Sequence, residues 1–334
     1  MSVSGSNYEI GKAIGMAARS LLIRSMDNYR ITLAAEGWTG PWELPEGYLS
    51  AAREIFPHLV EELQGMADGS GLSFRDLFFL NSLEEALEYR KPLACTAIAV
   101  SGQKEVWLGH NEDWYASDRD TVIVICARPK GKPAFISVTA APFLAAVGMN
   151  ETGLAQGVNS VEALDSGMGV PRMFAARAVL EAASLEEALT LATPTGRAGG
   201  YNHLLASGDG TIGNLETTAT AADYLTGAEL IFHTNHYTSP ALTELAEKPS
   251  DHSLVRYERL TEMADNIVDN SSVKEALIDA LSDHGNRPRS ICRHVEEQSA
   301  REATIFSALF DLKKLQAWVA VGNPCSKKFR KILF

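Results

Sequence analysis

The stretch Leu93-Ala94-Cys95-Thr96-Ala97-Ile98-Ala99-Val100 decides how the rest of this 334-residue sequence is interpreted. A cysteine directly follows a small residue and stands at the start of an apolar run that is typical of a β-strand. Such a thiol suggests a new N-terminus made by cutting the Ala94–Cys95 peptide bond. The freed α-amine has a reference pKa of about 8, so it can act as the base for its own thiol during attack on a carbonyl carbon.

The cut itself is within reach of the same thiol. Sγ of Cys95 can attack the carbonyl carbon of Ala94 in an N-to-S acyl shift, and water then hydrolyses the resulting thioester. The small side chain at position 94 leaves room for this strained geometry. The sequence therefore predicts a self-cleaving chain whose nucleophile is Cys95.

Apolar residues recur at helical spacing before this stretch and at a period of two after it. The sequence therefore predicts a largely helical leader, with helices over residues 8–35 and 48–66 and a third that starts at Ser73. From Cys95 onward, closely spaced strands joined by short turns predict hairpins and antiparallel sheets. Helices are expected over 172–183, from Ser184, and over 253–264 and 272–281, and strands over 96–100, 106–108, 121–128, 134–138, 154–158, 202–206, 211–216, 230–233, 303–311 and 315–321.

This order of elements predicts an α+β fold in which two antiparallel sheets stack and helices cover both outer faces. The formal net charge of -12 repels phosphate backbones and anionic lipid surfaces, so we expect neither nucleic acid nor a membrane as a partner. The N-terminal residues lack the basic and apolar regions of a secretory signal, and no apolar run approaches the ~20 residues of a membrane span. A cytoplasmic location is therefore expected.

The other cysteines and the histidines form no pattern of a metal site. Cys126, Cys292 and Cys325 are far apart in sequence and form no C-x-x-C pair, which argues against a zinc site or a disulfide framework. His233 and His236 lie three apart on an expected strand, so their side chains would face opposite sides. The G-x-G-x-x-G match at 208–213 joins two strands instead of opening a helix, which indicates a β-turn. We therefore expect no metal and no cofactor.

Five short motifs stand at intervals along the chain: Ala94-Cys95-Thr96, Gly109-His110-Asn111-Glu112-Asp113-Trp114, Phe232-His233-Thr234-Asn235-His236, Ser290-Ile291-Cys292-Arg293 and Arg301-Glu302-Ala303-Thr304. In order and approximate spacing they resemble the acyl-CoA:6-aminopenicillanic acid acyltransferase family of the N-terminal-nucleophile hydrolases, which is related to the choloylglycine hydrolases. The resemblance covers most of the chain and implies a four-layer αββα sandwich. It also implies that residues 1–94 become a small chain that stays bound to the catalytic chain, residues 95–334, so that both form one globular unit.

A hairpin after Cys95 brings Asp113 back beside the strand that Cys95 begins. A carboxylate there can hold the new α-amine by a charge-assisted hydrogen bond. On the residues alone, Asp113 can equally be a turn aspartate beside a solvent-facing Glu112. The resemblance implies that the aspartate of the Asn-x-Asp motif lies in the active site, which favours Asp113 and leaves Asn111 as the lesser candidate.

Two further residues complete the expected site. Asn235 ends an apolar strand, where its amide can either satisfy a turn or donate to the oxyanion of a tetrahedral intermediate, a contact typically worth about 3 kcal/mol of barrier. The resemblance implies the oxyanion role. It also implies that Arg301, before the Ala-Thr pair, is the fixed positive charge that favours the thiolate, with Arg293 as its rival. The chain departs from the fungal acyltransferase at Glu112, Ala300 and Glu302.

These residues predict a cysteine enzyme that acts on a non-peptide carbon–nitrogen bond of an N-acylated small molecule through a thioester on Cys95. Water as the acceptor gives an amide hydrolase, which we favour because water is always present; an amine as acceptor, with acyl-CoA or an amide as donor, gives an acyltransferase. The alternative of another class is an unprocessed binding protein, whereas a Ser-His-Asp hydrolase lacks its G-x-S-x-G motif. The sequence is compatible with a homo-oligomer and does not define the oligomeric state. The candidates for the substrate pocket are Trp114, Tyr115, Phe143 and Tyr237.

Overall fold

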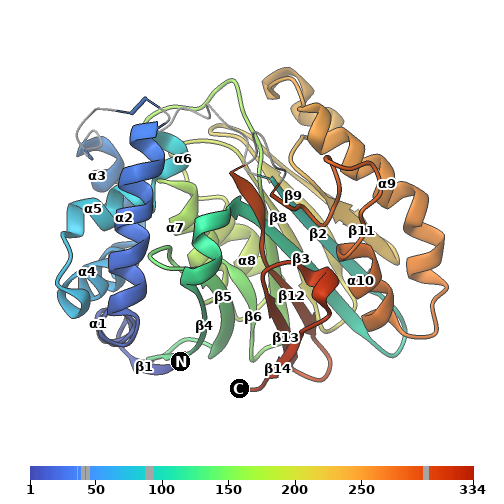
Figure 1. Cartoon of the computed structure of the whole chain (residues 1–334), viewed down its shortest axis with the longest axis horizontal. Coiled ribbons are helices and arrows are strands. Elements are labelled where there is room, and N and C mark those ends of the chain that lie inside the picture. The colour runs from blue at the N-terminus through green and yellow to red at the C-terminus, as the bar shows by residue number, and fades with distance from the viewer. Residues whose placement is uncertain (36, 39–41, 43–45, 87–93, 296–300) are drawn as a thin grey trace.

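Two stacked β-sheets with helices on both outer faces form this protein in the computed structural model (Figure 1). The structure describes residues 1–334 except 36, 39–41, 43–45, 87–93 and 296–300. The predicted α+β, four-layer αββα sandwich is therefore confirmed. Within the described ranges, none of the helices combines the length and the apolar composition that crossing a membrane requires.

The leader is largely helical, as predicted, with four differences. The helix expected over 8–35 is two helices, Asn7–Ala17 and Arg19–Ala35, and the short helix Leu83–Ala86 was not predicted. The first residues of the leader form a strand that pairs in parallel with β4 (Val122–Pro129), and this strand was not predicted because only Val3 of its four residues is buried. The helix expected over 48–66 is two helices, because Pro57 has no N–H to continue the first and instead starts the second. The leader elements are β1 (Ser2–Gly5), α1 (Asn7–Ala17), α2 (Arg19–Ala35), α3 (Glu46–Ile55), α4 (Pro57–Ser70), α5 (Phe74–Leu80) and α6 (Leu83–Ala86).

The first sheet has the order β1-β4-β5-β6-β7-β8-β9-β10, and all of its neighbours after β1 are antiparallel. Two short strands were not predicted: β6 contains a glycine among its four residues, and β10 contains no buried residue. The helix expected from Ser184 is present, and the Ser184 side chain accepts the N–H of Glu187 as a cap. The elements are β5 (Phe135–Ala140), β6 (Val147–Asn150), β7 (Leu154–Ser160), α7 (Arg172–Val179), α8 (Leu185–Ala192), β8 (Tyr201–Ser207), β9 (Ile212–Thr217) and β10 (Ala222–Gly227).

The second sheet has the order β11-β2-β3-β12-β13-β14 and is antiparallel throughout. Its strand β3 is longer than predicted, because the polar run from Asn111 to Asp113 hides the period of two. The elements are β2 (Ala94–Ser101), β3 (Val106–Tyr115), η1 (Ala116–Thr121), β11 (Leu230–His233), η2 (Pro240–Leu245), α9 (Asp251–Val268), α10 (Val273–Leu281), β12 (Glu302–Asp311), β13 (Gln316–Val321), η3 (Pro324–Ser326) and β14 (Arg330–Ile332).

Strands β2 and β3 lie at the centre of the sandwich, between the first sheet and helices α9 and α10 (Figure 1). On one face, Ile98 packs in a cluster with Leu277 of α10. On the other face the sheets approach closely: a Cβ added to Gly157 of β7 would lie 3.2 Å from Cβ of Ala97 and 3.1 Å from Nδ1 of His110. A side chain at the start of β2 therefore points either between the sheets or toward α9.

Candidate active site

The register of β2 and β3 surrounds the Ala94–Cys95 peptide bond with two carboxylates. Cys95 lies opposite Glu112, and Ala94 lies opposite Asp113. Because side chains alternate along a strand, Cys95 and Glu112 share the face between the sheets, and Asp113 lies on the face toward α9. The alternative on the residues alone was a turn aspartate at 113 beside a solvent-facing Glu112, whereas both residues lie within β3 and Glu112 faces the first sheet.

The thiol of Cys95 has a proton acceptor within hydrogen-bond distance. Its Sγ lies 3.3 Å from Oε1 of Glu112, and Oε2 of the same carboxylate lies 3.0 Å from Nε2 of the fully buried His110. Burial, followed by the nearby carboxylates of Glu112 and Asp113, raises the pKa of the Cys95 thiol well above its ordinary value. The intact chain therefore holds this sulfur as a neutral thiol whose proton faces Glu112.

Asn235 binds the amide nitrogen of the cysteine. It lies just after β11, and its Oδ1 accepts the N–H of Cys95 at 2.9 Å and Nη2 of Arg256 at 2.7 Å. Its Nδ2 donates to the carbonyl oxygen of Ser160 at 3.0 Å. The N–H of Cys95 and the guanidinium of Arg256 can only donate, and the carbonyl oxygen of Ser160 can only accept. These partners therefore fix which atom of the Asn235 side-chain amide is the oxygen and which is the nitrogen. The structure thus brings Asn235 to Cys95 as predicted, with one hydrogen of Nδ2 already used.

Arg256 of α9 is a site residue that sequence reasoning missed. Its side chain is almost fully buried, and Nη1 donates to the carbonyl oxygen of Cys95 at 2.6 Å and to Oγ1 of Thr96 at 2.8 Å. Burial lowers the pKa of Arg256 to about 10, so the guanidinium keeps its charge at neutral pH. The sequence signal was an arginine on the same face of the expected helix as the buried Leu260.

Asp113 offers an oxygen without a partner at the peptide bond to be cut. The residue is fully buried, and Oδ1 accepts the hydroxyl of Thr304 at 2.6 Å, whereas Oδ2 has no hydrogen-bond partner in the described part of the chain. Burial raises the pKa of Asp113 to about 7, against the opposing charges of Arg256 and Arg293. Asn111, the lesser candidate, instead donates to the carbonyl oxygens of Leu281 and Ile291.

The buried Asp113 predicts a pH-dependent gain in stability when it is replaced by asparagine. Between its ordinary pKa of 3.8 and the folded value of about 7, only the unfolded chain releases the proton, so the free energy of unfolding falls as the pH rises. In an intact Cys95→Ala background, Asp113→Asn should remove this loss. The stabilisation should be small at pH 4 and reach at most about 4 kcal/mol above pH 7, measured by urea unfolding. A difference that does not change with pH would contradict the assignment.

The structure does not bring the side chain of Arg301 to the thiol. Arg301 is exposed at the start of β12, where its carbonyl oxygen accepts the N–H of Ala116 at 2.7 Å. Its rival Arg293 lies closer to the site, because it forms an ion pair with Glu302 at 2.6 Å and its charge acts on Asp113. The role expected of Arg301 stays a prediction, and the guanidinium that contacts Cys95 is that of Arg256.

An apolar pocket lies beside Glu112 on the face between the sheets. Trp114 and Phe143, two of the four residues expected there, line it. Tyr115 is not among its lining residues; it is buried, with its ring edge-on to that of Tyr29. The pocket therefore places an apolar surface next to Glu112, the carboxylate that faces the thiol of Cys95. Its lining consists of Glu84, Glu112, Trp114, Val138, Thr139, Ala140, Phe143, Ala146, Val147, Val158, Ser160, Met173, Tyr201, Ile305 and Phe306.

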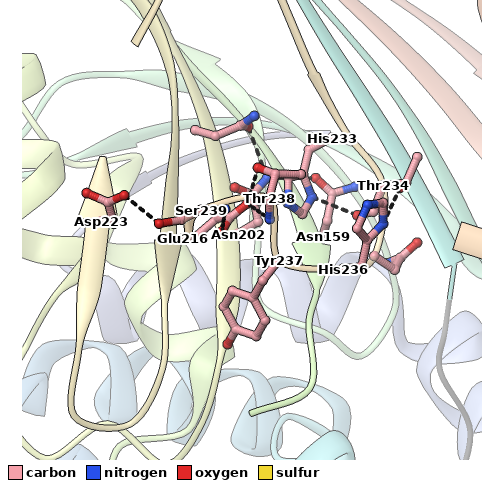
Figure 2. Close-up of polar contacts among 12 residues, drawn as sticks. Asn159, Asn202, Glu216, Asp223, His233, Thr234, His236, Tyr237, Thr238 and Ser239 are labelled. Atoms are coloured by element: carbon pink, nitrogen blue, oxygen red, sulfur yellow. Dashed lines mark hydrogen bonds and ion pairs between the residues drawn. The ribbon is translucent and has the colours of Figure 1, made fainter. Parts of the chain in front are cut away.

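A buried carboxylate holds the loop that carries Asn235. Glu216 of β9 lies 3.0 Å from Nε2 of His233, and the same carboxylate accepts the backbone N–H groups of Thr238 at 2.8 Å and Ser239 at 3.0 Å (Figure 2). Hydrogen bonds on both sides of Asn235 thus fix this loop to the first sheet. Glu216 was not predicted, because its partners lie some 17 to 23 residues away in sequence.

The two histidines of this segment have different partners. His233 faces Glu216, whereas Nδ1 of His236 lies 2.8 Å from the hydroxyl of Ser253 on α9 (Figure 2). The nearby Tyr237, the fourth residue expected in the substrate pocket, donates its hydroxyl to the carbonyl oxygen of Thr217 at 2.7 Å and does not line the apolar pocket. This segment therefore serves to hold Asn235.

Comparison with known proteins gives matches over most of the chain. The family model described as acyl-coenzyme A:6-aminopenicillanic acid acyl-transferase matches residues 100–326. The acyl-coenzyme A:6-aminopenicillanic-acid-acyltransferase 40 kDa form of Emericella nidulans is 25% identical over 343 residues, which cover 97% of this chain and 92% of that protein. The beta-alanyl-dopamine/carcinine hydrolase of Drosophila melanogaster is 28% identical over 222 residues, 58% of this chain and 56% of that protein. The structure of the Caenorhabditis elegans ortholog of N-acylethanolamine-hydrolyzing acid amidase aligns with a TM-score of 0.47 and 16% identity over 66% of this chain and 93% of that one.

Proposed function

The chain belongs to the acyl-coenzyme A:6-aminopenicillanic acid acyl-transferase family, and from this we propose that it is a self-processing cysteine enzyme that hydrolyses the amide bond of N-acylated small molecules. One observation carries the proposal. The amide nitrogen of Cys95 is bound by Asn235, and its thiol faces Glu112. Asp113, whose Oδ2 has no hydrogen-bond partner among the described residues, lies opposite Ala94 in the neighbouring strand. A purely structural cysteine would need none of these neighbours.

The proposed first step is the cut between Ala94 and Cys95. Glu112 accepts the proton of Sγ, the sulfur attacks the carbonyl carbon of Ala94, and the C–N bond breaks as the proton passes to the nitrogen. Water then hydrolyses the thioester, which releases the carboxylate of Ala94 and restores the thiol. His110, 3.0 Å from the far oxygen of Glu112, orients the base.

The freed amine is the proposed base for turnover. In the intact chain Asn235 already binds this nitrogen, and Oδ2 of Asp113 is the oxygen left to hold the ammonium form. The sulfur attacks the acyl carbon of the substrate, the second hydrogen of Nδ2 of Asn235 donates to the oxyanion, and the amine product leaves with the proton. Arg256, which contacts the carbonyl of Cys95, is proposed as a fixed positive charge of the site in addition to the expected Arg301.

The apolar pocket is the proposed binding site for the acyl group of the substrate. Trp114, Phe143 and Phe306 provide a surface for an aliphatic or aromatic chain in the pocket that Glu112 also lines. The acceptor decides between two outcomes, because the acyl-enzyme is common to both. With water as the acceptor, the enzyme is the hydrolase that we propose. With an amine such as 6-aminopenicillanic acid as the acceptor and acyl-CoA as the donor, it is the alternative acyltransferase. The name of the relative in Emericella nidulans, an acyltransferase, supports this alternative.

The leader is proposed to stay bound after the cut, as a small chain of residues 1–94 in one globular unit with residues 95–334. Buried contacts cross the cut: Glu62 of the leader forms an ion pair with the fully buried Arg177 at 2.8 Å, and the hydroxyl of Tyr29 donates to Asp118 at 2.6 Å. Separation would break both contacts and leave Arg177 with Glu181, 3.2 Å away, as its remaining partner. The two chains should therefore purify together.

Trapping of the acyl-enzyme tests the proposed function. Processed protein is mixed with acyl-CoA, N-acyl amino acids or β-alanyl amines, the reaction is stopped with acid, and the masses of the protein chains are measured by mass spectrometry. In parallel reactions, the free acid that is released is quantified with and without an added amine. The proposal expects an acyl adduct on the chain that begins at Cys95 and free acid as the main product. Amide product in place of free acid would indicate the acyltransferase, and substrate turnover with no adduct on this chain would contradict both.

A further inference from the structure

A second group of reactive side chains lies outside the candidate active site. His284 follows α10, Cys292 and His294 follow in the same loop, and Cys325 comes from η3. One ligand atom from each of the four side chains lies within 4.8 Å of all the others. Sequence spacing argued against a zinc site, because the cysteines are far apart in sequence and form no C-x-x-C pair. The fold brings these residues together.

The three distances from Nε2 of His294 to the other ligand atoms are close to the edges of a tetrahedron around a zinc ion. Nε2 of His294 lies 3.5 Å from Sγ of Cys292, 3.5 Å from Sγ of Cys325 and 3.0 Å from Nε2 of His284. With Zn–S bonds of about 2.3 Å and Zn–N bonds of about 2.0–2.1 Å, a regular tetrahedron has S···N edges of about 3.5 Å and N···N edges of about 3.3 Å. One zinc ion can therefore reach all four atoms with little movement.

The chemistry of the four ligands also fits zinc. Two thiolates and two imidazoles in a tetrahedral arrangement are a typical zinc ligand set, and two thiolates balance the charge of Zn²⁺. A neighbouring donor faces the sulfur of the fully buried Cys292, because Nδ2 of Asn323 lies 3.6 Å from it. Such hydrogen bonds to coordinating groups are characteristic of metal sites. Four protein ligands leave no open position for substrate.

We propose that His284, Cys292, His294 and Cys325 bind one zinc ion in a structural site. The ion would tie the loop after α10 to η3 behind the candidate active site. Arg293 lies between two of the ligands, and its backbone N–H donates to Oγ1 of Thr304 at 2.9 Å, which in turn donates to Asp113. Binding of the ion thus supports the hydrogen bond that orients the buried carboxylate.

Metal analysis of the full-length protein tests this proposal. Protein purified with a reductant and without a chelator is expected to carry one zinc ion per chain. Cys325→Ser and His294→Ala should lose the ion, whereas Cys126→Ser, which removes a cysteine on β4 far from the cluster, should keep it. Removal of zinc from the wild-type protein should lower its melting temperature. Adding cobalt(II) should produce the absorption of a tetrahedral cobalt–thiolate site in wild-type protein and in Cys126→Ser alone.

Three results would overturn the proposal. The first is wild-type protein that carries no stoichiometric metal and takes up none when zinc is added. The second is a disulfide between Cys292 and Cys325 in protein prepared under reductant, and the third is one ion per chain of another metal. If Cys325→Ser does not fold, the wild-type protein is titrated with a thiol reagent instead. Release of zinc as the cysteines react would support the site, and retention of zinc would contradict it. Cleavage at Ala94–Cys95 is followed separately, so failure of the zinc site and failure of the proposed function remain distinguishable.

Discussion

Cys95→Ala is expected to leave the chain whole and to abolish turnover of N-acyl substrates, with a loss on the order of 10⁴-fold or more in kcat. Without Sγ, no atom can form the thioester that both the cut and the proposed turnover require. The remaining groups, Asn235 and Arg256 among them, can bind the substrate but cannot replace the nucleophile. The intact mass of the chain and the release of free acid measure the two effects.

Cys126→Ala is the matched control, because it removes a half-buried cysteine of β4 that has no contact with the site. It should be processed and should turn over like the wild type. Cys95→Ser, which keeps a weaker nucleophile, should process slowly. Fragments ending at Ala94 in the Cys95→Ala protein, or turnover by its intact chain at the wild-type rate, would show that the nucleophile is another residue.

Arg256→Met is expected to destabilise the folded chain by about 1–3 kcal/mol for each buried acceptor that it leaves unpaired, and to prevent processing. The substitution removes the donors to the carbonyl oxygen of Cys95 and to Oδ1 of Asn235, all of which lie in the protein interior. It also removes a positive charge that acts on the buried Asp113. Urea unfolding in the Cys95→Ala background gives the stability, since neither protein is then cut, and gel analysis of Arg256→Met in the wild-type background gives the processing.

Arg259→Met is the control from the same helix. Arg259 is partly exposed and pairs with Asp283 and Glu262 at the surface, so its loss should change the free energy of unfolding by no more than about 1 kcal/mol and should leave processing intact. Equal effects of the two substitutions would mean that Arg256 acts only through general helix packing. Processing of Arg256→Met at the wild-type rate would remove it from the proposed mechanism.

Local sequence pattern predicted the parts of the site that follow from strand register. A hairpin after Cys95 returns Asp113 to its side. The pairing of β11 with β2, which brings Asn235 to Cys95, was not predicted, and Asn235 was chosen by the family resemblance. The same pattern predicted the stacked sheets and most of their strands. Strands β6, β10 and β14 escaped because they are short and lack the alternation of buried and exposed residues on which such a prediction depends.

The residues that were missed are those placed by contacts between distant segments. Arg256 donates a hydrogen bond to the carbonyl oxygen of Cys95, which lies 161 positions earlier in the sequence. The spacing of apolar residues along the chain cannot predict such a contact. Glu112 was not predicted as a site residue, because its strand is unusually polar and Glu112 was considered only as a solvent-facing neighbour of Asp113. The pairing of β2 with β3 places it opposite Cys95. Arg301 was chosen by resemblance alone, and its side chain lies at the surface.

The mass spectrum of the freshly purified protein shows whether the chain cuts its own Ala94–Cys95 bond. Self-cleavage gives two masses that correspond to residues 1–94 and 95–334, present together after size-exclusion chromatography, and one undivided mass for Cys95→Ala. An undivided wild-type chain that hydrolyses N-acyl substrates would show that the activity does not need this cut.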